Sequence, residues 1–163
     1  LLTVNFPPTS IHRGDVDDFL QTNIFMSQEV VSSGDYVRVG LSRVATHLDE
    51  SDLTSKVVIF CNSKGAVVHY MNNLERKLDE RDNLSDCLCI HGGLNKHEKF
   101  MRIRFFCGID GEYVADSCFR TLISTNAANV GIDNDHIDLV VRFGLPRDLM
   151  TYFQERGRGA RQP

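Results

Sequence analysis

The chain has 163 residues, a net charge of −4, 42% hydrophobic residues and 25% charged residues. This composition is typical of a globular domain, and the length suits a single domain. No apolar run approaches the ~18 residues that cross a bilayer, so we predict no membrane partner. The acidic net charge gives no general sign of nucleic-acid binding, although a local basic cluster can still set the field at close range.

The cysteines and the chain ends indicate the compartment in which the protein works and whether the chain is part of a longer protein. Five cysteines, an odd number without paired Cys-x-x-Cys spacing, argue against a zinc site or a disulfide framework, and we predict no metal site. We expect reduced thiols, mostly in the core, in the nucleus or the cytoplasm. No signal peptide is visible, and the sequence starts without Met, so we expect a piece of a longer chain.

Predicted strands and helices alternate along the chain. Residues 1–22 are rich in turn formers and charge and predict an interdomain linker, which leaves residues 23–163 as the domain. Apolar β-branched runs predict strands, and apolar residues every three or four positions predict helices. The predicted order is strand 23–31, helix 35–50, strand 57–60, helix 64–78, strand 86–93, helix 96–106, strand 119–125, strand 136–144 and helix 147–156.

This alternation predicts an α/β fold, a three-layer parallel sheet with helices on both faces. Ser63 is a predicted helix N-cap, and Asn95 with Glu98 resembles a capping box. Ligands bind such sheets at the carboxyl ends of the strands. The unusual stretches "CNS", "HGG" and "STNAANVGID" follow three of the strands, so we expect the functional site at that edge.

The stretch "STNAANVGID" follows the strand predicted at 119–125. The Thr125 hydroxyl and free backbone N–H groups at a strand end can hold a phosphate. Gly131 allows a sharp turn, after which Asp133 leaves the loop as a fixed carboxylate. The alternative is a plain connection between elements, in which Thr125 and Asp133 only cap backbone groups.

The last stretch, "YFQERGRGARQP", places three arginines within six residues. Arginine suits phosphate because its planar fork stays charged and binds two oxygens. We predict that Gln154 lies on a helix, that Gly157 ends this helix, and that Arg158 and Arg161 follow in a loop. The alternative is a solvated basic tail, or an Arg-Gly stretch that grips nucleic acid nonspecifically.

Five segments in order resemble the second RecA-like domain of superfamily-two helicases, and within these the RecQ family of DNA helicases. "FCNSK" resembles motif IV, "STNAANVGID" motif V, and "QERGRGAR" the motif VI pattern Q-x-x-G-R-x-G-R. "IHGGL" resembles the RecQ turn "YHAGL", and "FGLPRDLMTYFQE" a RecQ stretch of Gly-Leu-Pro, an aromatic pair and Gln-Glu. The resemblance covers about residues 23–163 and implies the helicase C-terminal form of the P-loop NTPase fold.

The chain departs from the RecQ pattern in three places. Ala160 replaces the second glycine of motif VI, and Asn129 and Val130 replace the usual Gly-Met of motif V. The link at 108–118 is longer than usual, which indicates a divergent lineage with a surface insertion.

The resemblance implies roles for individual residues at a nucleotide. Arg158 and Arg161 match arginine fingers, and Gln154 matches a residue that senses the γ-phosphate. Asp133 matches the residue that links the nucleotide, or its arginines, to the nucleic acid. We assign Gly131 and Gly157 to the same nucleotide-binding segments.

The resemblance also implies a nucleic-acid path across the strand ends. Thr125 matches a contact to the single-strand backbone. Asn62, Ser63 and His91 follow neighbouring strands, and we assign them to phosphate contacts along the same path. For His91 the alternative is a loop histidine with a structural hydrogen bond.

The function implied is the C-terminal motor domain of an ATP-dependent DNA helicase that unwinds 3′ to 5′ and acts in DNA repair or recombination. Its partner would be single-stranded or partly duplex DNA. The chain has no G-x-x-x-x-G-K-[ST], so ATP and Mg²⁺ would be held mainly by an N-terminal RecA-like domain, and the isolated chain would be inactive. One alternative is a degenerate module that binds nucleic acid or protein without catalysis, and another is a DEAD-box-type RNA helicase domain.

Overall fold

The structure of the chain is a computed structural model. It describes residues 2–5, 25–28, 32, 34–81, 83, 86–108, 119–125, 132, 134 and 136–158. Of residues 2–5, 25–28, 149 and 156 it describes the backbone course only.

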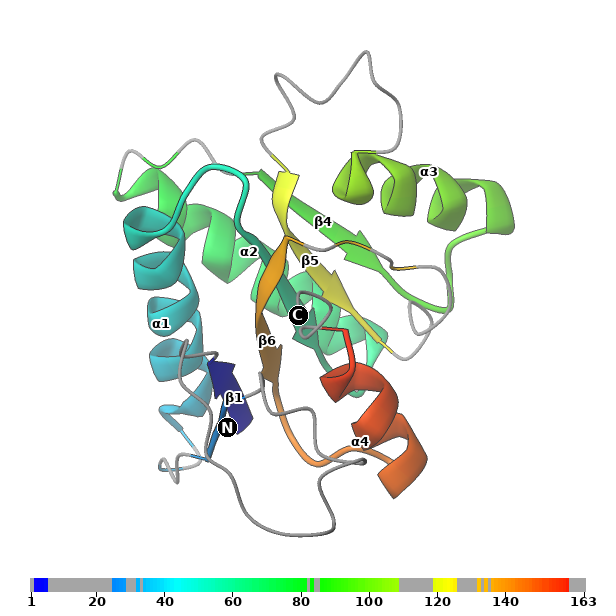
Figure 1. Ribbon diagram of the computed structural model, residues 1–163, viewed down its shortest axis with the longest axis horizontal. Coiled ribbons are helices and arrows are strands. Elements are labelled where there is room, and N and C mark those ends of the chain that lie inside the picture. Colours follow the sequence, from blue (N-terminus) through cyan, green and yellow to red (C-terminus); the bar gives the residue numbers. More distant parts are fainter. Residues whose placement is uncertain are drawn as a thin grey trace, which may run out of the picture.

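The described residues form one sheet of six strands in the middle of the fold, in the order β2-β1-β6-β3-β5-β4 (Figure 1). Four strands run parallel, because β3 pairs in parallel with both β5 and β6, and β4 pairs in parallel with β5. The predicted α/β fold with a parallel sheet is confirmed. The parallel strands are β3 (Lys56–Phe60), β4 (Asp86–Ile90), β5 (Phe119–Ser124) and β6 (Ile137–Arg142).

Two further strands extend the sheet beyond β6. Leu2–Asn5 forms β1, which pairs antiparallel with β6, and Phe25–Gln28 forms β2, which pairs antiparallel with β1. The linker predicted for residues 1–22 is therefore corrected for its first residues, because they join the sheet. Turn-forming and charged residues indicate only local backbone preference, whereas β1 forms because it pairs with β6, which is far along the chain.

Helices cover both faces of the sheet. Alternate residues of β3 point to opposite faces, as the period of two requires. Val57 and Ile59 pack with the apolar side chains of α1 (Tyr36–Glu50) and α2 (Lys64–Asp79). Val58 and Phe60 pack on the other face, with Phe106 of α3 (Lys96–Cys107). The fourth helix, α4 (Leu149–Arg156), follows β6 and leads to the last described residues.

Local signals fix the helix ends where the sequence predicts them. The Ser63 hydroxyl accepts a hydrogen bond from the Ala66 N–H at 3.1 Å and caps α2. Asn95 and Glu98 form the predicted capping box of α3. Gly157 ends α4, as predicted, with its N–H bonded to the Phe153 carbonyl at 2.9 Å.

Two aromatic side chains on helices are exposed. Helical spacing in the sequence predicts that Phe100 and Phe153 face the core, but these side chains are 54% and 55% exposed. In both helices the buried face is narrower than the helical period alone indicates, and Phe106 is the buried aromatic of α3.

Cys61, Cys87 and Cys89 are core side chains, as predicted, and burial raises the pKa of Cys61 to about 12. None of the described helices is both long and apolar enough for a bilayer.

Candidate nucleotide and nucleic-acid site

The carboxyl ends of the four parallel strands lie side by side and are joined by backbone hydrogen bonds. The Cys61 N–H donates to the Ser124 carbonyl at 2.9 Å, and the Thr125 N–H donates to the Ile90 carbonyl at 3.1 Å. The Phe143 N–H donates to the Phe60 carbonyl at 2.9 Å. The predicted residues that follow these strands therefore share one edge of the sheet.

His91 lies at the end of β4 and is 7% exposed. Its Nδ1 accepts a hydrogen bond from the Gly93 N–H at 3.1 Å, which places the ring proton of the neutral form on Nε2. Burial, and then the charges of Lys64, Arg102 and Lys99, lower the pKa of His91. The histidine is therefore neutral near pH 7 and can donate from Nε2, but it adds no positive charge.

Basic side chains around His91 supply the charge that the histidine lacks, and the sequence reading did not single them out. Lys64 follows the cap of α2, and a side chain at Gly93 would lie 3.2 Å from its Nζ. Lys99 and Arg102 lie on α3, and Arg102 donates to the Cys89 carbonyl at 2.7 Å. The signal available in the sequence was Lys64 directly after the capping serine, because helix N-termini attract anions.

Thr125 is held in place by the end of β4. Besides the bond from its N–H, the neighbouring Ser124 hydroxyl lies 3.1 Å from the Ile90 carbonyl and 2.6 Å from the Thr125 carbonyl. Thr125 is half-buried at the edge where phosphate contacts are predicted. Gly131 and Asp133, assigned to the nucleotide, lie outside the described residues.

Asn62 and Ser63 have internal partners. The Asn62 amide donates to the Leu145 carbonyl at 3.1 Å, and its oxygen accepts from Arg142. The Ser63 hydroxyl caps α2 and is exposed. Contacts from either residue to nucleic acid stay predictions, and the Asn62 side chain already has a structural role.

The closing helix brings the predicted arginine to the segment that follows β5. Asp148 caps α4 by accepting from the Thr151 N–H at 2.7 Å. Gln154 is exposed on this helix. Arg158 is half-buried, and its Nη1 donates to the Ile132 carbonyl at 2.6 Å. Motif VI thus contacts motif V directly, while Arg161 lies outside the described residues.

These groups fit an anion such as the phosphates of ATP. Arg158 and the exposed amide of Gln154 stand one turn apart at the end of α4. Within the described ranges, no three His, Cys, Asp or Glu side chains gather as a metal site requires. Arg158 and Gln154 are the described groups at the end of α4 that could face such an anion.

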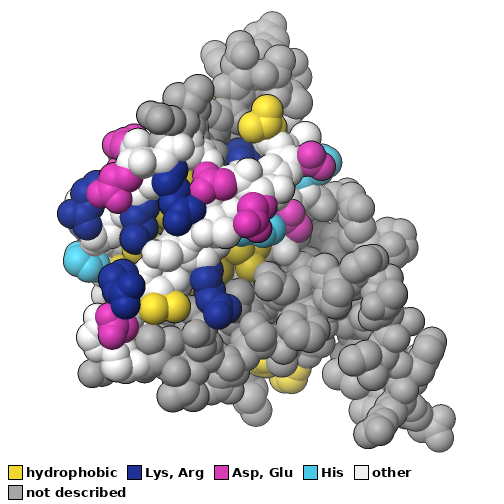
Figure 2. Space-filling model, turned by 90° about the vertical axis from the view of Figure 1, so that its left-hand side faces the viewer, with side chains coloured by type: hydrophobic (Ala, Val, Ile, Leu, Met, Phe, Trp, Pro, Cys, Tyr) yellow, Lys and Arg dark blue, Asp and Glu magenta, His cyan; other side chains and the backbone are white. Residues whose placement is uncertain are grey.

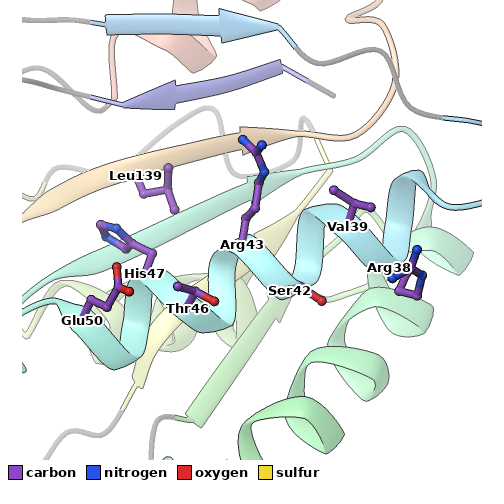
Figure 3. A pocket seen from close by; sticks show the side chains of 8 residues that line it. All are labelled: Arg38, Val39, Ser42, Arg43, Thr46, His47, Glu50 and Leu139. Atoms are coloured by element: carbon purple, nitrogen blue, oxygen red, sulfur yellow. The ribbon is translucent and has the colours of Figure 1, made fainter.

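A cavity of about 420 Å³ lies along α1, apart from these residues. Figure 3 shows its side chains along one side of that helix, with Leu139 of β6 opposite. Its volume matches small-molecule sites, but several of its polar groups are already bonded. The Ser42 hydroxyl accepts from Lys77 at 3.1 Å, and His47 pairs with Asp138 at 3.1 Å. We assign no ligand to it.

The side of the molecule where α1 lies carries charges of both signs. Figure 2 shows Lys and Arg side chains interspersed with Asp and Glu. Arg38 pairs with Asp35 at 2.9 Å, and Arg81 pairs with Asp49 at 2.7 Å. The described residues of this side therefore present no uniform field to a polyanion, whereas three basic side chains and one acidic side chain, Glu98, act on His91.

Comparison with known proteins gives a family and a set of relatives. The model of the helicase conserved C-terminal domain matches residues 41–162. "DEAD-box ATP-dependent RNA helicase 50" of Oryza sativa subsp. japonica is 32% identical over 112 residues, 69% of this chain and 16% of that protein. "ATP-dependent RNA helicase DbpA" of Bacillus subtilis is 34% identical over 105 residues, 64% of this chain and 19% of that protein. The chain thus spans less than a fifth of the length of these relatives.

Solved structures show the same fold. The second domain of the DEAD-box helicase Mss116p, bound to an RNA duplex, has a TM-score of 0.61 at 19% identity, over 77% of this chain and 44% of that one. The E. coli DEAD-box protein SrmB, bound to regulator of ribonuclease activity A, has a TM-score of 0.53 at 20% identity, over 77% of this chain and 65% of that one. The predicted RecA-like helicase C-terminal domain is confirmed.

The predicted resemblance to RecQ DNA helicases is wrong. The relatives named above are DEAD-box RNA helicases, so DNA unwinding and DNA repair or recombination are not supported. The motifs misled because contacts to phosphate carry no information on which nucleic acid is bound. The short "FGLP … YFQE" stretch was the basis for DNA, and it does not report on the nucleic acid.

Proposed function

Because the chain belongs to the family of the helicase conserved C-terminal domain, we propose that it is the second motor lobe of an ATP-dependent RNA helicase of the DEAD-box type. The observation that carries the motor role is the contact between Arg158 and Ile132, which brings the arginine of motif VI to motif V. The choice of RNA is supported by the DEAD-box RNA helicases to which the chain is similar.

Each group in the site has a defined task in this proposal. ATP, bound with Mg²⁺ mainly by the N-terminal RecA-like lobe of the parent protein, supplies the phosphoryl group that passes to water. Arg158 stabilises the charge that develops on that group, an effect worth about 10³–10⁵ in rate for such arginines. Arg161, Gln154 and Asp133 keep their predicted roles beside it, and Gly131 and Gly157 shape the two segments.

The RNA backbone would follow the carboxyl ends of β3, β4 and β5. His91 donates from Nε2, while Lys64 and Lys99 supply positive charge beside it. Thr125 supplies a hydroxyl from the end of β5. Contacts of this kind bind phosphate without reading bases, so the lobe would hold RNA of any sequence.

The isolated chain is expected to be inactive, since the phosphate loop and the metal carboxylates belong to the other lobe. The parent protein is expected to work in a reducing compartment, the nucleus or the cytoplasm.

The test is ATP hydrolysis by the full-length parent protein, measured alone, with an RNA oligonucleotide, and with DNA of the same sequence. We expect RNA to stimulate hydrolysis several-fold more than DNA does. Equal or stronger stimulation by DNA would reject the RNA assignment. RNA binding without any ATP hydrolysis would instead show a module that kept the fold and lost catalysis.

A further inference from the structure

A buried ion pair joins the closing helix to the end of the sheet. Arg142 is the last residue of β6, and its Nη1 lies 2.7 Å from Glu155 Oε1 on α4. Both side chains are 5% exposed. A contact this short between buried charges holds the helix in one rotation, because turning α4 would leave both charges unpaired.

The same guanidinium also reaches the end of β3. Arg142 Nη2 donates to the side-chain oxygen of Asn62 and, at 3.2 Å, to the Leu145 carbonyl. Gly144 makes room for this arrangement, since its φ is +81° and a side chain there would lie 3.0 Å from Asn62 Nδ2. Arg142 therefore fixes three segments at once: the end of β3, the loop after β6, and α4.

Glu155 passes this constraint on to Arg158 through the backbone. The Glu155 carbonyl accepts the Arg158 N–H at 3.3 Å, one turn further along. The Glu155 side chain is bonded to Arg142 of β6, and its carbonyl accepts the N–H of Arg158, whose guanidinium contacts Ile132. The path from Arg142 to Arg158 is thus one ion pair and one backbone hydrogen bond.

We propose that Arg142 and Glu155 are positioning residues, which hold α4 so that Arg158 points toward the nucleotide. The proposal rests on the function proposed above, since it assigns these two residues to the same site. Neither residue touches the nucleotide; both act through Arg158.

The pair is poorly explained as a device for stability alone. Burying two charges costs free energy that their attraction only partly returns, and apolar replacements are often as stable. In the described part of the chain, Arg142 Nε is also buried without a hydrogen-bond partner. Burial raises the pKa of Glu155, although Arg142 opposes this effect. A fixed direction for α4 is what the pair supplies.

The experiment compares Glu155→Gln with the matched control Glu80→Gln in the full-length parent. Glu80 is an exposed carboxylate at the end of α2, and its variant is expected to behave as wild type. For Glu155→Gln we expect RNA-stimulated kcat to fall by about tenfold or more, since small misplacements of catalytic groups have such effects. The KM for ATP stays within about twofold of wild type. Tm falls, because Glu155→Gln leaves Arg142 buried without its counter-charge, so kcat is compared at a temperature where both proteins are folded.

A second variant, Arg142→Lys, tests the positioning role if Glu155→Gln folds poorly. Arg142→Lys retains the charge but loses the fork that reaches both Glu155 and Asn62, so kcat should fall similarly. The double variant should lose no more than either single variant, because the two residues act through one contact.

Wild-type kcat in Glu155→Gln, losses that multiply in the double variant, or a KM for ATP that rises well beyond twofold would overturn the positioning role. A parent protein without RNA-stimulated hydrolysis would instead reject the proposed function, and the two failures are therefore distinguishable.

Discussion

The Arg158 guanidinium donates a 2.6 Å hydrogen bond to the carbonyl oxygen of Ile132, a residue 26 positions earlier in the chain. Ile132 is fully buried in the core that includes Phe106 of α3. The backbone of a buried residue thus holds this arginine at the end of α4, and its guanidinium stays charged at neutral pH.

The pH dependence of stability should report on Glu155. Burial, followed by Asp148, raises its pKa from 4.5 to about 7, while Arg142 lowers it. Because the folded pKa lies above the unfolded one, the stabilisation is present below about pH 4.5 and is lost as pH rises through about 7. The free energy of unfolding should therefore fall by up to about 3 kcal/mol across this window.

Urea denaturation at about pH 5 and about pH 8 measures this difference. Glu155→Gln should remove most of it, since the amide does not titrate. A wild-type curve that is flat over this range, or a variant with the same slope as wild type, would show that Glu155 is not the group responsible.

Arg120 should be a principal structural residue at the opposite end of the sheet. It is 4% exposed, and it donates to the carbonyls of Leu48 at 2.8 Å and Asp52 at 2.7 Å, at and beyond the end of α1. Arg120→Met keeps the length but leaves these carbonyls unpaired, which should cost about 3 kcal/mol of unfolding free energy. The exposed Arg76→Met should change stability by less than about 0.5 kcal/mol in the same urea titration. Equal losses in both would contradict the role of Arg120.

The charge beside His91 should appear in the salt dependence of RNA binding. Lys64→Gln in the parent protein should lower the slope of log Kd against log salt by about 0.7, the value for one contact to a single-stranded phosphate. Thr125→Ala should weaken binding with the slope and the ATP affinity unchanged, because a hydroxyl releases no counterion. An unchanged slope in Lys64→Gln would place Lys64 outside the RNA path, and unchanged affinity in Thr125→Ala would do the same for Thr125.

Sequence reasoning worked where the determinants are local. The caps at Ser63 and Asn95 were predictable because a side chain bonds a backbone N–H three residues on. The apolar run at Val57–Phe60 predicted a strand, and both faces of this strand are covered. The meeting of the predicted residues at the carboxyl ends of the strands followed from the parallel order.

Features that depend on residues far apart in the sequence could not be predicted from local patterns. The strand at Leu2–Asn5 depends on pairing with β6, more than 130 residues away. The pair of Arg142 with Glu155 depends on the loop between β6 and α4, which folds the helix back on the strand. The choice between RNA and DNA was missed because residues suited to phosphate do not distinguish the two nucleic acids.

The most direct measurement is RNA-stimulated ATP turnover by Arg158→Ala in the full-length parent, with the exposed Arg76→Ala as the matched control. We expect a loss of at least about 10³-fold in kcat, with RNA affinity and Tm close to wild type. Arg161→Ala, at a residue outside the described part of the chain, should behave in the same way. Turnover by Arg158→Ala at the wild-type rate would contradict the role of Arg158 at the nucleotide, and with it the motor function proposed for this lobe.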